Sequence, residues 1–315
     1  MSRLFTTVSA ITLLTGTAAL ADAPKVVADI APVHSLVSRV MDGIGKPDLI
    51  VPNETSPHDY RLRPADAEAL ENAGLVFWMG EGLTPWMERA LDSLSGDATV
   101  IELLALDETN THPFREGALF DAHDHDDHDD HDDHDDHDDH DDHGHGAHDP
   151  HAWLSPENAK LWLNIIASKL SVADTENAAS YFTNAAAGQA EIEDMVAEVS
   201  ATLKPVQGGK FVVFHDAYQY FENDFDFYAS GAISLSDASD PSPARIAKIQ
   251  RRIRNEGIQC VLAEPQYKKG LVATVMEGSN ATASVIDPLG ADIKPGPKLY
   301  TQLIKNMAKT LRDCL

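Results

Sequence analysis

Short apolar runs alternate with segments of helical periodicity along most of the chain. In the first third, the apolar runs predict buried strands and the segments between them predict helices. The predicted strands are residues 25–30, 48–51, 75–79 and 99–103, and the predicted helices are residues 32–41, 64–72 and 84–94. Strands that alternate with helices in this way indicate βαβ units and a parallel sheet.

The same alternation returns after a long Ala-rich stretch. Ser155 followed by Pro156 predicts the start of a helix. From about residue 175, apolar residues recur on one helical face, at Ile192, Met195, Val196, Val199 and Leu203. Further strands are predicted at 210–214, 259–263 and 283–286, and further helices at 243–255, 268–278 and 297–312.

The two sets predict an α/β fold made of two α/β lobes with parallel sheets, joined by one long helix. The N-terminal lobe is expected at residues 22–172, the linking helix at 173–205 and the C-terminal lobe at 206–315. A length of 315 residues suits two lobes better than one small core.

The first 21 residues have the pattern of a cleaved signal peptide. Arg3 precedes an apolar stretch at 4–20, and Ala19-Leu20-Ala21 has the small-x-small form of a cleavage site. The alternative, a membrane anchor, is weaker because the stretch is short and contains several Ser and Thr residues. We therefore expect cleavage after Ala21 and a soluble exported protein, in the periplasm.

An acidic tract changes the picture that the apolar pattern gives. Residues 121–149 hold fifteen Asp and no Lys, Arg or Glu, so the tract carries −15 of the formal charge of −27. The triplet His-Asp-Asp repeats six times from residue 125 to residue 142. Such a segment cannot bury an apolar core, so we expect a disordered loop. The acidic balance disfavours nucleic acid and anionic lipid as partners and favours cations.

The imidazoles of this tract predict a loop that captures metal ions loosely and reversibly. The alternative is a solvated acidic linker, which would not need a His in every triplet. Because protons compete for imidazole, capture should weaken as the pH falls below ~6.5. The residues concerned are His123, His125, His128, His131, His134, His137, His140, His143, His145 and His148.

Three His outside the tract stand in positions that suit a metal site. His58 follows a predicted strand, His151 precedes the helix that Ser155 starts, and His215 ends a strand. In open α/β sheets, ligands bind outside the carboxyl ends of the strands. Three imidazoles with one carboxylate or water make a four-coordinate site suited to Zn²⁺. Each residue could instead be an ordinary structural His, as we interpret His34 and His112.

Asp287, at the end of another predicted strand, is the candidate for the fourth ligand. Because Pro288 follows it, Asp287 could instead start a turn. Each ligating imidazole also needs a partner for its second nitrogen. The candidates for that role are Asp59, Asp216 and Glu264.

The chain contains two cysteines, Cys260 and Cys314. In an oxidising compartment an isolated pair indicates a disulfide, which would stabilise the fold by roughly 4 kcal/mol. The alternative is a pair of thiolate metal ligands, although the spacing matches no zinc motif.

These motifs resemble the metal-binding class of ABC-transporter substrate-binding proteins, over essentially the whole mature chain. The matching segments are residues 58–64, the acidic His-rich loop, and residues 151–156, 214–218, 263–266 and 287–290. The resemblance implies a rigid helix between the lobes and zinc held by His58, His151 and His215. It also implies a Cys260–Cys314 disulfide, and an ABC permease with its ATPase in the inner membrane as partners of a monomer.

One departure from the family pattern concerns the fourth ligand. Some zinc-binding members carry Glu directly before the first ligand, where this chain has Pro57. The fourth position is then left to Asp287 or solvent. Manganese-binding relatives typically have Glu at the third ligand position, so His215 favours zinc.

The sequence thus predicts an extracytoplasmic protein that delivers Zn(II) to an importer and is not an enzyme. Two alternatives remain. A zinc hydrolase could use the same three imidazoles, although no H-E-x-x-H helix or nucleophile elbow is present. A manganese-binding transport protein or adhesin of the same fold is the other.

Overall fold

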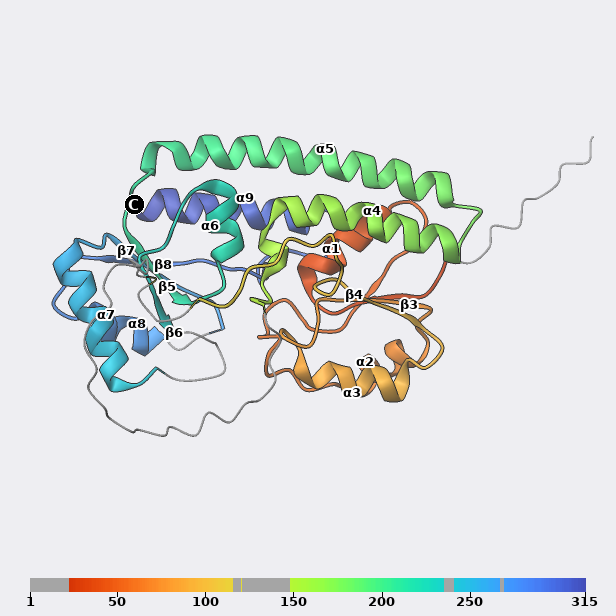
Figure 1. The fold of residues 1–315 in the computed structure, drawn as a ribbon, viewed down its shortest axis with the longest axis horizontal. Helices are drawn as coiled ribbons and strands as arrows, with labels where there is room; N and C mark the ends of the chain where they lie inside the picture. The colour runs from red at the N-terminus through yellow and green to blue at the C-terminus, as the bar shows by residue number, and fades with distance from the viewer. Residues whose placement is uncertain (1–22, 116–119, 121–147, 235–240, 267–268) are drawn as a thin grey trace, which may run out of the picture.

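The computed structural model describes residues 23–115, 120, 148–234, 241–266 and 269–315 (Figure 1). The expected signal peptide and the histidines of the tract from His123 to His145 lie outside these residues. Within the described part of the chain, no helix is both long and apolar enough to cross a membrane.

The first sheet is parallel and has the strand order β2-β1-β3-β4. Its strands are β1 (Val26–Ala28), β2 (Asp48–Leu49), β3 (Leu75–Trp78) and β4 (Thr99–Glu102). The helices α1 (Ala31–Val40), α2 (Pro64–Glu71) and α3 (Pro85–Leu94) connect them. Each of the predicted elements of this lobe is confirmed, with bounds that differ by one or two residues.

The second sheet is also parallel and has the order β6-β5-β7-β8. Its strands are β5 (Phe211–His215), β6 (Ala232–Ser234), β7 (Cys260–Ala263) and β8 (Thr282–Val285). The associated helices are α6 (Gln219–Phe225), α7 (Pro243–Glu256), α8 (Lys269–Met276) and α9 (Leu299–Cys314). The sequence did not predict α6 or β6.

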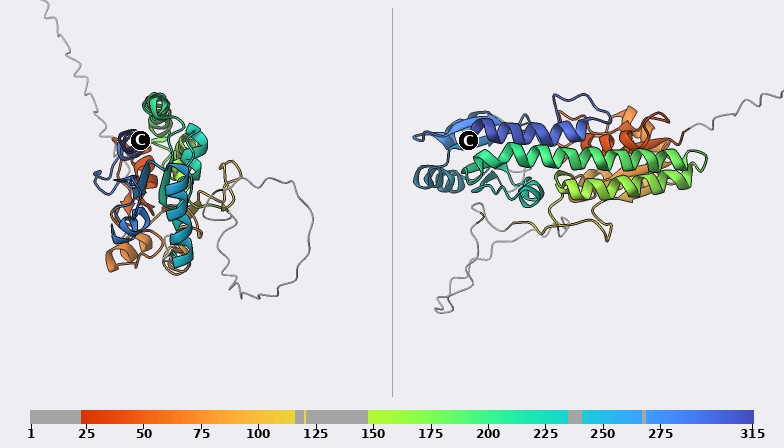
Figure 2. Two further views of the ribbon diagram at one scale, coloured as in Figure 1. Left: turned by 90° about the vertical axis from the view of Figure 1, so that its left-hand side faces the viewer. Right: turned by 90° about the horizontal axis from the view of Figure 1, so that it is seen from above.

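Two long helices form the layer that runs along the molecule. After the short 3-10 helix η1 (Ala152–Leu154), α4 spans Pro156–Ala173 and α5 spans Ala178–Leu203, followed by η2 (Lys204–Val206). In Figure 1, α5 extends from the region of the first sheet to that of the second, and Figure 2 shows α9 alongside it. The α/β fold with a long helix along both lobes is therefore confirmed.

The long predicted helix starts later than expected because Asp174 ends α4. The Asp174 backbone leaves the helical region at φ −140° and ψ 83°. Its side-chain oxygens accept hydrogen bonds from the Asn177 backbone N–H, at 3.2 Å, and from the Tyr181 hydroxyl, at 2.8 Å. The start of α4 follows the prediction, since the Ser155 hydroxyl accepts a hydrogen bond from the Asn158 N–H.

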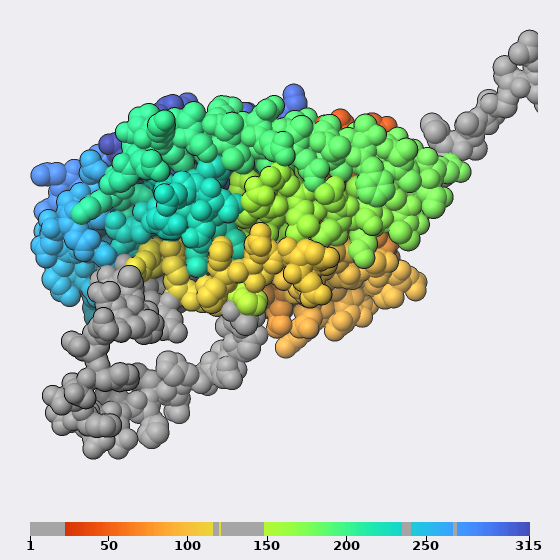
Figure 3. Space-filling model, turned by 45° about the horizontal axis from the view of Figure 1, so that its top comes forward, coloured from red at the N-terminus to blue at the C-terminus, as the bar shows by residue number. Residues whose placement is uncertain are grey.

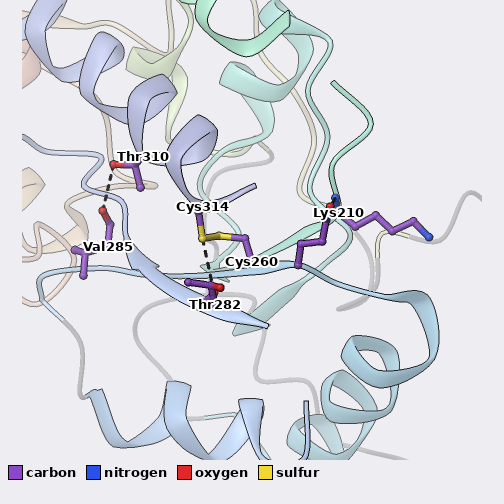
Figure 4. The surroundings of a disulfide bond; sticks show 7 residues. Lys210, Cys260, Thr282, Val285, Thr310 and Cys314 are labelled. Carbon is purple, nitrogen blue, oxygen red and sulfur yellow. Dashed lines mark hydrogen bonds between the residues drawn. A yellow bond between two sulfur atoms is a disulfide. The ribbon is translucent and has the colours of Figure 1, made fainter. Parts of the chain in front are cut away.

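The disulfide is present between Cys260 on β7 and Cys314 at the end of α9 (Figure 4). One further contact and one hydrogen bond join α9 to the neighbouring strand β8. The Cys314 sulfur lies 3.7 Å from the Thr282 carbonyl oxygen, and the Thr310 hydroxyl donates to the Val285 carbonyl. The last helix is thus fixed to the edge of the second sheet.

Candidate metal site

The three predicted imidazoles line one small pocket between the lobes. His58 lies in the loop after β2, His151 directly precedes η1, and His215 is the last residue of β5. The pocket has a volume of about 10 Å³, the room that one water molecule or one ion needs. Its lining residues are Ser56, Pro57, His58, His151, Trp153, His215, Glu264, Gln266, Pro288 and Leu289.

His151 and His215 face each other through their Nε2 atoms, which lie 3.3 Å apart. Both residues are buried, with exposed fractions of 6% and 3%. Zinc binds imidazole nitrogen at about 2.0–2.1 Å. A tetrahedral arrangement with bonds of that length places two nitrogens about 3.3–3.4 Å apart. The two Nε2 atoms therefore already have the separation of two ligands on one zinc ion.

A buried carboxylate holds the second nitrogen of each of these rings. His151 Nδ1 lies 2.7 Å from Asp149 Oδ1, and His215 Nδ1 lies 2.6 Å from Glu264 Oε1. A carboxylate accepts a hydrogen bond from Nδ1–H, and in a neutral ring of that tautomer Nε2 carries a lone pair directed into the pocket. Two facing lone pairs repel each other unless a cation lies between them. This arrangement is suited to a divalent metal ion.

The loops that carry His58 and His151 are held by tryptophan side chains. Trp86 Nε1 donates to the Pro57 carbonyl at 2.8 Å, next to His58. Trp153 Nε1 donates to the Pro288 carbonyl at 2.9 Å, which joins η1 to the loop after β8. The pocket wall is therefore fixed from both lobes.

His58 is the least enclosed of the three imidazoles. Its side chain is partly exposed, and its ring centroid lies 5.7 Å from that of His151. Over the described residues, no group of three or more His, Cys, Asp and Glu side chains already stands in the geometry of a metal site. The Nε2 atoms of His151 and His215 thus have the separation of two metal ligands. His58 does not yet complete a three-ligand arrangement with them.

Asp287 lies beside the pocket and not in its wall. The carboxylate accepts hydrogen bonds from the backbone N–H groups of Leu289 and Gly290, both at 2.9 Å, and from that of Ala291. Burial raises the pKa of Asp287, and these backbone bonds oppose that shift. The carboxylate thus holds the turn that carries Pro288 into the pocket wall, and its role as a ligand stays a prediction.

Of the three residues predicted to bind the second nitrogen of an imidazole, Glu264 does so, at His215. Asp216 faces away toward Arg115, whose Nε lies 2.9 Å from its Oδ1, and Asp59 is exposed. Burial opposes the charge of Arg115, but Asp216 and the buried Glu222 raise its pKa above the ordinary value.

Sequence reasoning missed two residues of the site. Asp149 was counted only as part of the acidic tract, although its position two residues before His151 was a usable signal. Gln266 lines the pocket, and the only signal of it was the matching segment 263–266, in which no role was assigned to it. His34 makes structural contacts, with its Nε2 3.1 Å from the Pro47 carbonyl oxygen. The His112 ring packs against that of Tyr220 in a tilted arrangement, with 4.6 Å between the ring centroids.

The chain before the acidic tract and the last two residues of the tract meet next to the site. Pro113 and His148 form an antiparallel bridge, and the Asp149 N–H donates to the His112 carbonyl at 2.8 Å. His148, the one tract histidine among the described residues, is exposed. In Figure 3 the segment that leads to the tract runs along the front of the molecule between the lobes.

Comparisons with known proteins identify the family of the chain. The high-affinity zinc uptake system protein ZnuA of Brucella abortus (strain 2308) is 47% identical over 304 residues, which cover 92% of this chain and 91% of that protein. The protein of the same name from Paracoccus denitrificans (strain Pd 1222) is 44% identical over 310 residues, 95% of each chain.

Solved structures show the same fold. A crystal structure of ZnuA superposes with a TM-score of 0.73 at 22% identity, covering 93% of this chain and 99% of that one. The substrate-binding protein FpvC from Pseudomonas aeruginosa, in complex with Mn²⁺, gives a TM-score of 0.75 at 19% identity, covering 93% and 98%. Residues 26–314 match the family described as zinc-uptake complex component A, periplasmic, and the chain therefore belongs to the ZnuA family.

Proposed function

We propose that this protein binds Zn²⁺ in the periplasm with His58, His151 and His215 and delivers it to an ABC importer. Zinc is here the transported ion and not a resident cofactor. The observation that carries the assignment is the 3.3 Å separation of the Nε2 atoms of His151 and His215. Each of these rings is oriented by a buried carboxylate, which matches the second layer of contacts that zinc-binding imidazoles need.

The metal preference follows from the donors. Neutral imidazole is a borderline-soft ligand that suits zinc, whereas manganese favours sites richer in carboxylate oxygen. The carboxylates of Asp149 and Glu264 offset the ionic charge from behind the rings without occupying coordination positions. The site binds Zn²⁺ in preference to Mn²⁺.

The size of the pocket supports binding and not catalysis. A pocket of about 10 Å³ is far smaller than the roughly 300–1,000 Å³ of sites that enclose organic ligands. A zinc hydrolase needs room for its substrate beside the metal and for a general base above it. The three imidazoles therefore serve capture and release of an ion.

The histidine tract collects zinc near the mouth of the site. The chain that leads into it is bridged to its far end at Pro113 and His148, and Asp149, the next residue, contacts the ligand His151. Ions gathered on the tract are thus held close to the pocket. Docking on the permease, which works with its ATPase, perturbs the pocket and releases the ion.

The test is zinc stoichiometry and affinity, measured by competition with a chromogenic chelator. A variant lacking residues 121–147 is expected to keep one tight zinc, and His215→Ala in that background to lose it. His112→Ala is the matched control, since His112 lies outside the pocket. A truncated protein that binds no tight zinc, or whose affinity survives His215→Ala, would show that the assignment is wrong.

A further inference from the structure

Gln266 is a polar residue of the proposed zinc pocket. It is neither one of the three imidazoles nor one of their carboxylate partners, so its role is still open to explanation. It follows β7 by three residues and lines the same pocket as His58, His151 and His215. Its Oε1 atom is shielded from solvent and, among the described residues, has no hydrogen-bond partner. A buried acceptor without a partner is unfavourable, so such an atom at a binding site indicates a ligand.

Two candidate positions near the pocket do not supply a fourth donor. Pro57 lines the pocket and has no side-chain donor atom. The Asp287 carboxylate is bound to three backbone N–H groups and does not line the pocket. Glu264 lines the pocket as the partner of His215, with its Oε1 2.6 Å from His215 Nδ1.

We propose that Gln266 Oε1 is the fourth donor to the zinc ion, which completes a tetrahedral site of three imidazole nitrogens and one carboxamide oxygen. This inference rests on the proposed function of the same site. The small pocket volume favours a direct bond over a bridging water, because it leaves room for about one ion or one water molecule.

A carboxamide donor has a consequence for the choice of metal. An uncharged oxygen binds a divalent cation less strongly than a carboxylate, so the site holds zinc without the extra negative charge that manganese prefers. Gln266 lies in the chain between β7 and α8, so its side chain comes from the C-terminal lobe.

The experiment compares four variants of the protein lacking residues 121–147, so that a single site is measured. Gln266→Leu removes the donor at similar size, Gln266→Glu replaces it by a stronger one, and Asp287→Asn tests the rival position. Gln207→Leu, at an exposed residue, is the matched control. Zinc affinity is measured by chelator competition, and the visible spectrum of the Co²⁺-loaded protein reports the coordination.

The expected result is a 10- to 100-fold weaker zinc affinity for Gln266→Leu, the range found when groups that support a metal site are lost. Gln266→Glu should bind zinc at least as tightly as the parent, and Gln207→Leu should equal it. The Co²⁺ spectrum should change in both Gln266 variants and stay unchanged in Asp287→Asn and Gln207→Leu. The metal-free Gln266→Leu protein should be no less stable to urea, because the lost acceptor was unpaired; a structural role predicts a loss of stability instead.

Two results would overturn the inference in different ways. If His215→Ala abolishes tight binding while Gln266→Leu leaves affinity and spectrum unchanged, or if only Asp287→Asn weakens binding, Gln266 is not a donor and the proposed function stands. If His215→Ala itself leaves tight binding intact, both the donor assignment and the proposed function fail.

Discussion

Glu264 gives the sharpest test of how the second sheet prepares His215 for zinc. It follows β7 directly, and its side chain is 1% exposed, against 4% for His215. The 2.6 Å contact between Glu264 Oε1 and His215 Nδ1 fixes the ring so that Nε2 points at His151. Replacing this carboxylate changes the orientation and basicity of the ligand without touching the metal.

The size of the effect follows from what each substitution keeps. Partners of this kind contribute about 10- to 100-fold to metal affinity, which corresponds to about 1.4–2.7 kcal/mol. Glu264→Gln retains an acceptor for Nδ1–H but loses the charge, so we expect about tenfold weaker zinc binding. Glu264→Leu loses both and also frees the ring, so we expect about 100-fold.

The assay is chelator competition on the protein lacking residues 121–147, with the unfolding midpoint of the metal-free protein measured in parallel. Glu198→Gln is the control, because this exposed carboxylate pairs with Lys305 away from the site. The zinc dissociation constant should be smallest for the parent protein, larger for Glu264→Gln and largest for Glu264→Leu. Equal affinities for folded Glu264→Leu and parent protein would refute the claim that this carboxylate prepares His215.

Three further predictions concern stability of the metal-free protein. Burial raises the pKa of Asp29 to about 7, so the folded state binds a proton more tightly than the unfolded state, and stability falls as pH rises from 4 to 7. Asp29→Asn should remove that slope, which amounts to about 2.7 kcal/mol between pH 5 and pH 8, as measured by urea unfolding at these two pH values. Arg115→Met leaves two buried carboxylates unpaired and should cost about 3 kcal/mol at pH 8, less at pH 5 where they take up protons. Reduction of the Cys260–Cys314 bond, which spans 54 residues, should cost about 4 kcal/mol; an unchanged midpoint in any of the three would contradict the reasoning.

The strands and helices with a simple pattern could be predicted from the sequence, and α6 and β6 could not. Strand β6 has only three residues, too few for a periodicity. Helix α6 has seven residues and buries Glu222, a charged residue that polarity alone assigns to the surface. Its burial depends on Arg115, which lies 107 residues away along the chain.

The candidate site could also be predicted only in part, because a sequence shows its topology but not its side-chain contacts. His58 and His215 follow strands, and parallel strands bring their carboxyl ends together, so their convergence follows from the topology. The partners of the rings depend on side-chain directions, which a sequence does not give. Glu264 was one of several candidates, and Asp149 was hidden in the composition of the acidic tract.

The apolar core of this protein does not stop at the boundary between the lobes. One cluster of buried side chains includes Val27 and Phe77 of the first sheet, Val213 and Leu262 of the second, and Met195 of the helix that runs beside both. Swinging the lobes apart would expose part of that shared interior to water. Because that interior is continuous, separating the lobes carries a cost in exposed apolar surface that a fold with two independent cores would not have.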